Sequence, residues 1–484
     1  MDFILGHKMK VNFGGVEENV VTRDEVPLPV AKKNLEDEVI AILGYGPQGM
    51  GQGLNLRDNG FNVIVGQRES YHRGNEQPTT WERALADGWK PNKTLFSLEE
   101  AAGKGTIIAY LVSDAAQHAT WPSIKDCLET GNSLYFSHGF GPHFLGIKKP
   151  DVDVIMVAPK GAGLSVRRNF LNGSGINASY AVEQDVTGKA FKRAASMGIG
   201  IGAGFLFETT ARNEVVSDHF GERAFLLGEV WAITEAAYDA LREKYKMSGE
   251  QAFIGSSEQV TQVILPLIGS GGAAGIYNEA KKHGQLGTIL KYQKTIRETT
   301  LPFLEILYKS VEAGTEARKA IVANSNPNYR RMLEEELSAI NESDMWQIGN
   351  RIRTFVTDRT YGLRITNWGL AGAILGAMEA QYQTLINHGH TPSESFNETV
   401  EEATQSLNQF YQARGVAHLL GVCSTTAQRG ALDWGPEFKK LLLPQFLNLG
   451  MYNFEIQDMG QYTNPDMWAV GQKVRELRPE NRRR

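Results

Sequence analysis

The sequence predicts an α/β domain with a parallel sheet, followed by an all-α domain. Before about residue 208, short β-branched runs alternate with helical segments, a pattern typical of a sheet with helices on both faces. After residue 208 the chain has long amphipathic stretches and few strand-like runs. We therefore place the first domain at residues 1–208 and the helical domain at residues 209–484.

The composition is that of a globular enzyme. With 484 residues, of which 42% are hydrophobic and 22% charged, the chain is long enough to bury a large core. The net charge of −5 is small. The basic residues are scattered apart from the last stretch, "RELRPENRRR", which we interpret as a solvated tail. We therefore expect no nucleic-acid partner.

The cysteines and the N-terminus favour a cytoplasmic protein. Cys127 and Cys423 are too few for a disulfide framework or a zinc site, which indicates a reducing compartment. The N-terminus carries early acids and no long apolar run, so it resembles neither a signal peptide nor a transit peptide. The most apolar stretch, "MGIGIGAGFLF" at 197–207, is too short and glycine-rich to span a bilayer, and we expect no membrane partner.

Five runs predict the strands of the first domain. Each is rich in β-branched or aromatic residues and ends in glycine or polar residues. Because helical segments separate them, the strands are expected to lie parallel in one sheet. The runs are "VIAILGYG" (39–46), "FNVIVGQ" (61–67), "TIIAYLVS" (106–113), "SLYFSHG" (133–139) and "VDVIMVAPKG" (152–161).

The first run leads into a glycine-rich loop that predicts dinucleotide binding. A helix follows the loop and a second strand comes next, the context in which a G-x-G-x-x-G places a pyrophosphate at a helix N-terminus. Gly44 permits the tight turn, Gly46 lets the backbone approach the pyrophosphate, and Gly49 lets the helix pack closely. A purely structural turn is the alternative. The loop is Gly44-Tyr45-Gly46-Pro47-Gln48-Gly49.

The end of the second strand favours NADP over NAD. NAD-binding domains place an acid there for the ribose hydroxyls, whereas this chain has Gln67 and Arg68, followed by Ser70 and Arg73. A guanidinium and a hydroxyl suit a 2′-phosphate, although Glu69 would repel it if its side chain pointed inward. For Arg73, a solvated surface arginine is the alternative.

Two acidic stripes in the helical region predict a divalent-cation site. In "EVVSDHFGER" the acids Glu214, Asp218 and Glu222 recur at intervals of four, so they share one helix face and repel one another. In "NETVEEATQSLNQF" Glu398 and Glu402 have the same spacing. A solvated face is the alternative for one stripe. Two stripes from separate helices, however, supply the carboxylate oxygens that Mg²⁺ prefers, and the cation removes the repulsion.

A faint internal repeat connects the two stripes. Each half of the helical domain carries one acidic pair and lacks the other. We therefore interpret residues 209–352 and 353–484 as degenerate copies that complement each other in one metal site, with chance alignment as the alternative. At a shift of 144 residues the matches include Tyr238 with Tyr382, Leu241 with Leu385, Glu258 with Glu402 and Gly271 with Gly415.

Two polar residues lie where the first domain is expected to bind ligands. His138 and Lys160 each follow a predicted strand, at the edge of the sheet where open α/β folds bind ligands. An ordinary loop histidine and a surface lysine are the alternatives.

Taken together, these motifs resemble ketol-acid reductoisomerase, also called acetohydroxy-acid isomeroreductase, in its long form (class II). The resemblance extends over almost the whole chain. It implies a Rossmann-type NADPH-binding domain, a knotted helical domain whose fused copies form one active site, and a homo-oligomer, most simply a dimer. It rests on "LGYGPQGMGQGLNLRDNG", "SHGFG", "MVAPKGAGLSVR", "EVVSDHFGER", "NETVEEATQSLNQFYQARG" and "CSTTAQRG", in this order.

The resemblance implies a reaction and its metal ligands. The reaction is an alkyl migration in 2-acetolactate or 2-aceto-2-hydroxybutyrate, followed by reduction with NADPH. Two Mg²⁺ ions are implied, with Asp218 as the bridging ligand and Glu222, Glu398 and Glu402 as the others. Glu214 corresponds to a further acid beside them.

The resemblance also implies roles for three other residues. His138 and Lys160 correspond to polar residues of the family's active site. Ser424 corresponds to a serine that contacts substrate, although its sequence context alone also fits a helix N-cap. The segment "QRESYHRGNEQPTTWERALADGWKP" departs from the plant form in length and polarity, which leaves the recognition of the 2′-phosphate open.

Two other functions fit part of the sequence. A metal-free dehydrogenase of the β-hydroxyacid or 6-phosphogluconate kind would also join a Rossmann domain to a helical domain, but it needs no paired acids. A non-catalytic NADP-binding protein would keep the glycine loop without any need for four spaced carboxylates. Activity with acetolactate, with and without Mg²⁺, separates these functions.

Overall fold

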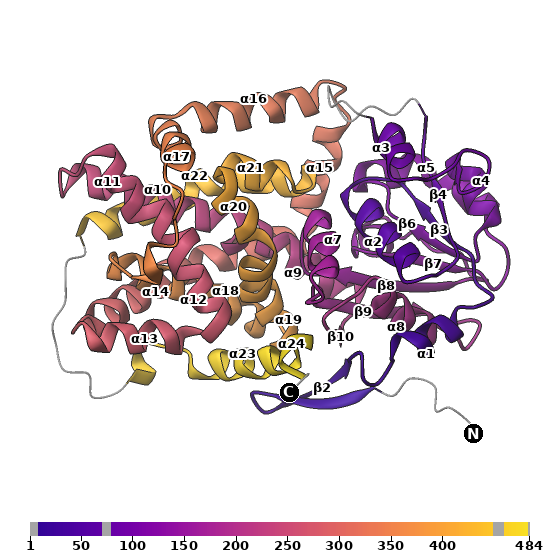
Figure 1. Ribbon diagram of the computed structural model, residues 1–484, viewed down its shortest axis with the longest axis horizontal. Helices are drawn as coiled ribbons and strands as arrows, with labels where there is room; N and C mark the ends of the chain where they lie inside the picture. Colours follow the sequence, from indigo (N-terminus) through magenta and orange to yellow (C-terminus); the bar gives the residue numbers. More distant parts are fainter. Residues whose placement is uncertain (1–7, 70–78, 449–458, 483–484) are drawn as a thin grey trace. The chain divides into compact units, whose positions relative to one another are not determined.

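The computed structural model describes residues 8–69, 79–448 and 459–482, and the chain divides into two compact units (Figure 1). The first unit comprises residues 1–215 with 474–484, and the second comprises residues 216–473. The division falls inside helix α9 (Ala211–Arg223), a few residues after the expected boundary at residue 208. This one helix carries Glu214 in the first unit and both Asp218 and Glu222 in the second.

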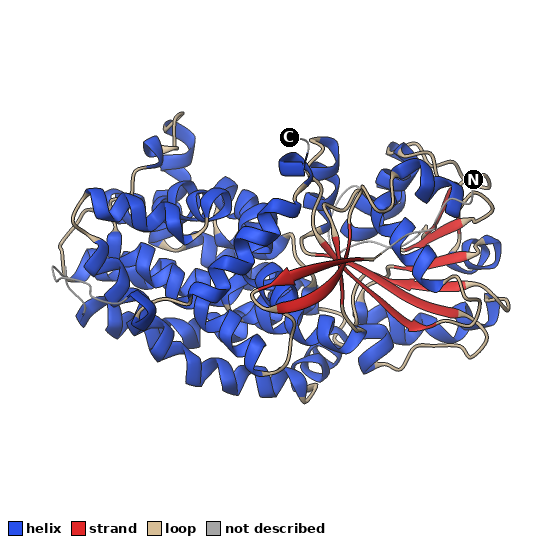
Figure 2. Ribbon diagram, turned by 90° about the horizontal axis from the view of Figure 1, so that it is seen from below, coloured by secondary structure: helices blue, strands red, loops and turns tan. Residues whose placement is uncertain are grey.

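The first unit contains one ten-stranded sheet (Figure 2). The five predicted strands are present as β3, β4, β6, β7 and β8, and with β5 they run parallel. Strand β3 lies between β4 and β6, so the strand order reverses beside it, and the glycine loop follows β3 at this switch point. In sheet order the strands are β1 (Met9–Phe13), β2 (Val16–Val21), β10 (Leu206–Glu208), β9 (Ala178–Gln184), β8 (Asp153–Pro159), β7 (Ser133–Phe136), β6 (Ile107–Tyr110), β3 (Ile40–Leu43), β4 (Val63–Gly66) and β5 (Leu95–Phe96).

Four strands extend the sheet beyond its parallel part, and sequence patterns did not predict them. β9 pairs antiparallel with β8, and β2 pairs antiparallel with β1 and β10. β1, β2 and β9 mix buried residues with exposed polar ones, and β10 has three residues. Such strands lack the continuous apolar run that identifies a buried parallel strand.

Alternating residues of the central strands fill two separate cores. Ile40 and Ile42 of β3 pack in one core with residues of α1, α2 and α8, whereas Ala41 and Leu43 pack in the other with residues of α4 and α5. Helices therefore cover both faces, as the sequence predicted. The helices of this unit before α9 are α1 (Leu28–Asn34), α2 (Pro47–Asp58), α3 (Thr80–Ala86), α4 (Leu98–Lys104), α5 (Asp114–Cys127), α6 (Phe140–Phe144), α7 (Gly163–Leu171) and α8 (Ala190–Gly200), and α24 (Pro479–Arg482) follows near the C-terminus.

The described elements of the second unit are all helical, as predicted. No single described helix is long and apolar enough to cross a membrane. Among the described residues, only the bent helix pair Gly249–Gly271 and Ala273–Lys282 has the length and composition of a possible span. The elements that follow α9 are η1 (Phe225–Glu229), α10 (Val230–Glu243), α11 (Gly249–Phe253), η2 (Ile254–Ile264), α12 (Leu265–Gly271), α13 (Ala273–Lys282), α14 (Leu286–Glu312), α15 (Thr315–Asn324), α16 (Tyr329–Glu342), α17 (Asp344–Phe355), η3 (Tyr361–Leu363), α18 (Trp368–Asn387), α19 (Pro392–Phe396), η4 (Asn397–Leu407), α20 (Asn408–Arg414), α21 (Val416–Gly421), α22 (Thr425–Asn448), η5 (Met459–Gln461) and α23 (Pro465–Leu477).

Two long helices of this unit contain π-helical segments at matching places. One runs through α11, η2 and α12, and the other through α19, η4 and α20. π-Helical segments are rare and are frequent at functional sites. Segment η4 carries both Glu398 and Glu402, so the second acidic stripe lies on a π-helix and not on the α-helix that its spacing predicted.

The internal repeat is visible in the element boundaries, but its register changes along the chain. Helices α10 and α18 end at Glu243 and Asn387, which are 144 residues apart as in the sequence alignment. The connection that follows is one residue shorter in the second copy, so Gly249 and Pro392, which begin the next helices, are 143 residues apart. Glu258 therefore corresponds to Glu401, and its alignment with Glu402 was wrong by one residue.

The two copies are also unequal in their acids. When the two copies are aligned with a shift of 143 residues, Gly255 and Gln259 of η2 stand at the positions of Glu398 and Glu402 in η4. Helix α9 precedes η1 and α10, whereas the residues before α18 form only the short 3₁₀ turn η3. Each copy therefore supplies acids that the other lacks.

A buried acid in η1 makes the stability of the second unit depend on pH. Glu229 is fully buried, and neither carboxylate oxygen accepts a hydrogen bond from a described residue. Burial raises the pKa of this carboxyl group from an ordinary value of 4.5 to about 8. Between these pH values the folded chain keeps a proton that the unfolded chain releases, so the free energy of unfolding falls as the pH rises.

We expect Glu229→Gln to raise the free energy of unfolding by about 2–3 kcal/mol at pH 7, because the amide needs no proton. The gain should shrink towards pH 5. Urea unfolding at both pH values in the presence of a chelator measures it, with the exposed Glu335→Gln as the control variant. An equal gain at both pH values would argue against a protonation effect.

Candidate active site

The glycine loop has the geometry of a pyrophosphate-binding turn. Gly44 has a φ of +95°, and a Cβ there would lie 2.9 Å from the backbone nitrogen of Val112. A Cβ on Gly49 would lie 1.9 Å from the Gly44 carbonyl oxygen, whereas the space beside Gly46 is open. Helix α2 begins at Pro47, so the open position adjoins a helix N-terminus with its unbonded N–H groups. These features fit a dinucleotide phosphate.

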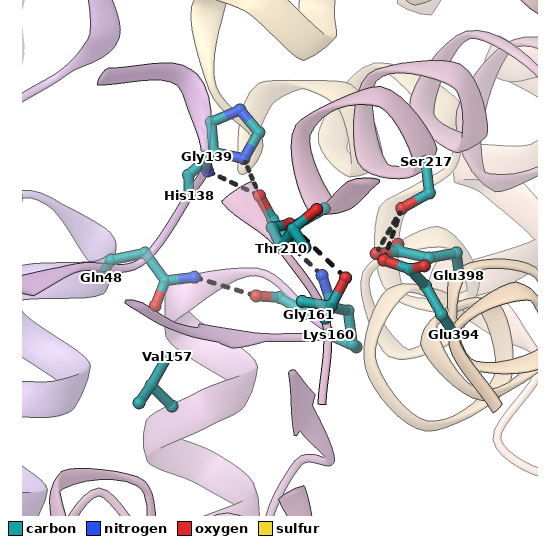
Figure 3. Close-up of polar contacts among 12 residues, drawn as sticks. Gln48, His138, Gly139, Val157, Lys160, Gly161, Thr210, Ser217, Glu394 and Glu398 are labelled. Atoms are coloured by element: carbon teal, nitrogen blue, oxygen red, sulfur yellow. Dashed lines mark hydrogen bonds and ion pairs between the residues drawn. The ribbon is translucent and has the colours of Figure 1, made fainter. Parts of the chain in front are cut away.

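The loop is held in place by the strand that ends next to Lys160. The Gln48 side-chain amide donates a hydrogen bond to the Gly161 carbonyl oxygen at 3.0 Å (Figure 3). A Cβ on Gly163 would lie 2.2 Å from the carbonyl carbon of Pro47, so only glycine allows α7 to begin this close to the loop. The end of β8 and the glycine loop therefore fix each other's position.

The two residues that directly follow β4 differ in burial. Gln67 is buried, and its side-chain oxygen accepts a hydrogen bond from the Tyr45 backbone N–H at 2.8 Å, so it supports the glycine turn. Arg68 is exposed directly after it, at the position where a ribose substituent would be recognised. Ser70 and Arg73 lie outside the described residues.

Glu214 brings His138 and Lys160 together in the first unit. Figure 3 shows the side chains of His138 and Lys160. One carboxylate oxygen lies 3.1 Å from Lys160 Nζ, and the other lies 3.1 Å from His138 Nδ1. The second oxygen also accepts a hydrogen bond from the Gly139 backbone N–H at 2.6 Å. His138 follows β7 and Lys160 follows β8, so neighbouring parallel strands deliver both side chains to one edge of the sheet.

The charge of this cluster is set by its burial and its ion pairs. Burial alone would raise the pKa of Glu214, but Lys160, His138 and the Gly139 N–H outweigh it and lower the pKa to about 2. The Lys160 and Glu214 side chains are only 1% and 2% exposed. An ionised carboxylate thus holds a buried cation and an imidazole in fixed positions, an arrangement suited to proton transfer and to stabilising negative charge.

Three of the predicted metal acids meet in the second unit. One carboxylate oxygen each from Asp218, Glu398 and Glu402 lies within 4.8 Å of the others. Glu398 and Glu402 are buried and Asp218 is half-buried. Gly221 on α9 allows this meeting, because a Cβ there would lie 3.1 Å from the Glu398 carbonyl oxygen. Carboxylates from α9 and η4 therefore form an all-oxygen cluster that fits Mg²⁺.

Comparison with known families covers both units. A model described as "Acetohydroxy acid isomeroreductase, NADPH-binding domain" matches residues 34–205. A model described as "Ketol-acid reductoisomerase, C-terminal domain" matches residues 212–357 and 368–449. The chain belongs to the ketol-acid reductoisomerase family. As a member, it is an enzyme with a nicotinamide dinucleotide-binding domain and a helical C-terminal domain, and its length is that of the long, plant-like form.

Three ketol-acid reductoisomerases show how far the similarity extends. The "Ketol-acid reductoisomerase (NAD(+))" of Desulfosudis oleivorans is 48% identical over 347 residues, which are 71% of this chain and 96% of that protein. The chloroplastic ketol-acid reductoisomerase of Pisum sativum is 34% identical over 468 residues, which are 91% of this chain and 77% of that protein. A solved NADH-preferring ketol-acid reductoisomerase from an uncultured archean matches with a TM-score of 0.57 at 28% identity, covering 70% of this chain and 99% of that chain.

Two residues that the ketol-acid reductoisomerase resemblance assigned to the site lie outside these clusters. Glu222 follows Asp218 by one turn of α9 but is not in the group within 4.8 Å, and one of its oxygens lies 3.9 Å from Arg223 Nη1. Ser424 is exposed, and its hydroxyl accepts a hydrogen bond from the Ala427 backbone N–H at 3.0 Å. Ser424 is therefore an N-cap of α22, and its contact with substrate stays a prediction.

Three buried residues beside the metal acids were not predicted. Ser217 Oγ lies 3.4 Å from Glu394 and 3.5 Å from Glu398, and Glu394 also lies 3.1 Å from His390 Nδ1. Figure 3 shows the Ser217 hydroxyl directed at the carboxylates of both glutamates. The sequence did hold a signal, since Glu394 extends the second acidic stripe by one turn just as Glu214 extends the first.

Proposed function

We propose that this chain is an Mg²⁺-dependent ketol-acid reductoisomerase of valine and isoleucine biosynthesis. The substrate is 2-acetolactate or 2-aceto-2-hydroxybutyrate, and the product is the 2,3-dihydroxy acid. The observation that carries the proposal is the meeting of Asp218 with Glu398 and Glu402, because a simple dehydrogenase needs no divalent cation.

Different residues of the chain would have different roles in the reaction. Asp218, Glu222, Glu398 and Glu402 would hold two Mg²⁺ ions. When bound, the ions would supply Lewis acidity to the hydroxyl and ketone oxygens of the substrate. In the isomerisation the alkyl group moves to the neighbouring carbon, and the proton of the first hydroxyl ends on the former ketone oxygen. A bound nicotinamide cofactor would supply the hydride that reduces the new ketone. Glu214 pairs with Lys160 and holds its ammonium group in place, so that the lysine can stabilise negative charge on the substrate.

We propose NADPH as the reductant. Arg68 offers a guanidinium where a 2′-phosphate would lie, and Ser70 and Arg73 follow in the part of the chain that is not described. The relatives named for NAD(+) and NADH make the opposite preference the clear alternative. Measuring kcat/KM with NADPH and with NADH decides which cofactor is preferred. Arg68→Ala should lower kcat/KM for NADPH and leave that for NADH unchanged. A parent enzyme that prefers NADH would contradict this assignment.

The activity itself is tested by following the oxidation of NADPH and of NADH with acetolactate, in Mg²⁺ and in a chelator. We expect turnover only in Mg²⁺. Turnover in the chelator would indicate a metal-free dehydrogenase instead. Cofactor binding without any turnover would indicate a non-catalytic binding protein.

The two acids of η4 should affect chemistry more than cofactor binding. We expect Glu398→Gln and Glu402→Gln each to lower the rate of isomerisation at least about 10-fold, because each loses a charged oxygen ligand. The dissociation constant for NADPH, measured by fluorescence titration, should stay within about twofold of the parent. The exposed Glu335→Gln is the matched control. Equal loss of cofactor affinity would argue against separate metal and cofactor sites.

We also propose a cytoplasmic homo-oligomer, most simply a dimer. Cys127 and Cys423 are free thiols, which suits a reducing compartment. The relatives from Saccharomyces cerevisiae and Pisum sativum are named mitochondrial and chloroplastic, so location differs within the family. Light scattering of the purified chain tests the oligomer, and cell fractionation tests the compartment. A monomer, or recovery in a membrane fraction, would refute the respective proposal.

A further inference from the structure

A buried histidine–glutamate pair directly precedes the metal acids of the second unit. His390 is 4% exposed and Glu394 is fully buried. His390 Nδ1 lies 3.1 Å from a Glu394 oxygen, and its Nε2 lies 2.8 Å from the hydroxyl oxygen of Tyr308. Both ring nitrogens are thus engaged, and the imidazole is held at two ends. Such fixing of a ring by two hydrogen bonds is typical of groups that orient metal ligands.

The pair is linked to the metal acids through Ser217. The Ser217 hydroxyl contacts both Glu394 and Glu398, at 3.4 Å and 3.5 Å from their oxygens (Figure 3). Ser217 directly precedes Asp218 on α9, whereas Glu398 lies on η4. The contact therefore ties together the two elements whose carboxylates meet.

Tyr308 provides a rigid end to this chain of contacts. It is fully buried in α14, and its ring stacks on that of His388 with the centroids 3.8 Å apart. His388 is half-buried and pairs with Glu305 at 2.8 Å. Since the hydroxyl of Tyr308 cannot follow a movement of His390, the position of the imidazole is fixed relative to α14.

The internal repeat supplies a comparison within the molecule. In the first copy, which lacks counterparts of Glu398 and Glu402, Gln251 stands at the position of Glu394 and Met247 at that of His390. Gln251 is exposed, and its side-chain oxygen accepts a hydrogen bond from the Ser248 backbone N–H as an ordinary helix cap. The buried pair therefore occurs only in the copy that has Glu398 and Glu402.

We infer that His390 is a positioning residue for the metal site: with Tyr308 it fixes Glu394 and, through Ser217, holds Glu398 beside Asp218. The inference rests on the proposed Mg²⁺ function of these acids. Three acids at intervals of four on one helix repel one another, and a donor held against Glu394 offsets part of that repulsion. Without it, Glu394 loses a contact that orients its carboxylate towards Ser217, and the support that Ser217 gives to Glu398 is weakened.

The test is a Mn²⁺ titration of the full-length protein, in which the electron paramagnetic resonance signal reports free Mn²⁺. We expect His390→Leu to weaken Mn²⁺ binding by about 10- to 100-fold, the usual effect of removing a group that orients a ligand. His390→Asn, which keeps a donor near the Nδ1 position, should restore most of the affinity. His388→Leu removes a neighbouring imidazole that stacks on the same tyrosine, and it should leave the affinity within about twofold of the parent.

Unfolding curves and the dissociation constant for NADPH should be similar in all three variants, which separates positioning from misfolding. Unchanged Mn²⁺ affinity in a folded His390→Leu variant would overturn the inference, as would equal losses in the Leu and Asn variants. If the parent itself binds no Mn²⁺, the proposed metal function has failed instead. If the parent binds and His390→Leu binds as tightly, only the positioning role has failed.

Discussion

Replacing Asp218 with asparagine is expected to abolish both the isomerisation and the Mg²⁺-dependent reduction. Asp218 is the only member of the three-carboxylate group on α9, and it faces two buried acids of η4. Neutralising it removes one of three anionic ligands, and we expect Mn²⁺ or Mg²⁺ affinity to fall by more than about 100-fold. The change is isosteric, so the fold of α9 should be retained.

The two steps can be followed separately in this variant. Isomerisation is measured from acetolactate, and reduction is measured by supplying the 2-ketoacid intermediate with NADPH. Asp126→Asn, at an exposed position of α5, is the control for the substitution itself. Full isomerisation by Asp218→Asn in Mg²⁺ would refute the role of this residue.

A second large effect is expected from Lys160→Met. The lysine and Glu214 are almost completely buried with 3.1 Å between Nζ and the carboxylate oxygen, so the variant leaves a buried carboxylate without its closest cation. Breaking such a pair costs about 3–5 kcal/mol of unfolding free energy. Activity should also be lost, because the cation that stabilises negative charge on the substrate is gone.

The loss of stability should depend on pH in a defined direction. The pKa of Glu214 is lowered from 4.5 to about 2 in the folded chain, so its stabilising contribution is present above pH 4.5 and fades as the pH falls towards 2. Urea unfolding should therefore show the largest difference between Lys160→Met and the parent near neutral pH and a smaller one near pH 4. The double variant Lys160→Met with Glu214→Gln should recover part of the stability at pH 7. A single variant that costs less than about 1 kcal/mol there would show that the pair is not coupled.

The parts of the fold that follow local rules were predictable from the sequence. Strands β3, β4, β6, β7 and β8 follow from their apolar runs, and the glycine loop follows β3 with spacing that fixes its turn. Gly46 is open and Gly49 is crowded, as expected for a phosphate loop. Strands β1 and β9 were missed because polar residues interrupt them. β1 is an edge strand in which exposed polar residues alternate with others, and β9, between β8 and β10, ends in exposed residues.

The acidic residues of the site were predictable from the sequence, but the buried residues that contact them were not. Spacing identified Asp218, Glu398 and Glu402, yet it could not show that η4 is a π-helix or that these three acids have oxygens within 4.8 Å of one another. His390 was missed because its partners come from α14 and α19, which the sequence alone does not bring together. Residue type and interval indicate which groups bear charge, whereas tertiary packing decides which of them meet.

The unequal copies of the helical unit have a consequence for how the metal site assembles. Asp218 and Glu398 belong to one polypeptide and to the same compact unit, so their meeting is an intramolecular event. The effective concentration of one carboxylate near the other is set by the chain that connects them and not by the amount of enzyme present. Diluting the protein far below any subunit dissociation constant should therefore leave Asp218 and Glu398 together, whatever happens to the association between chains.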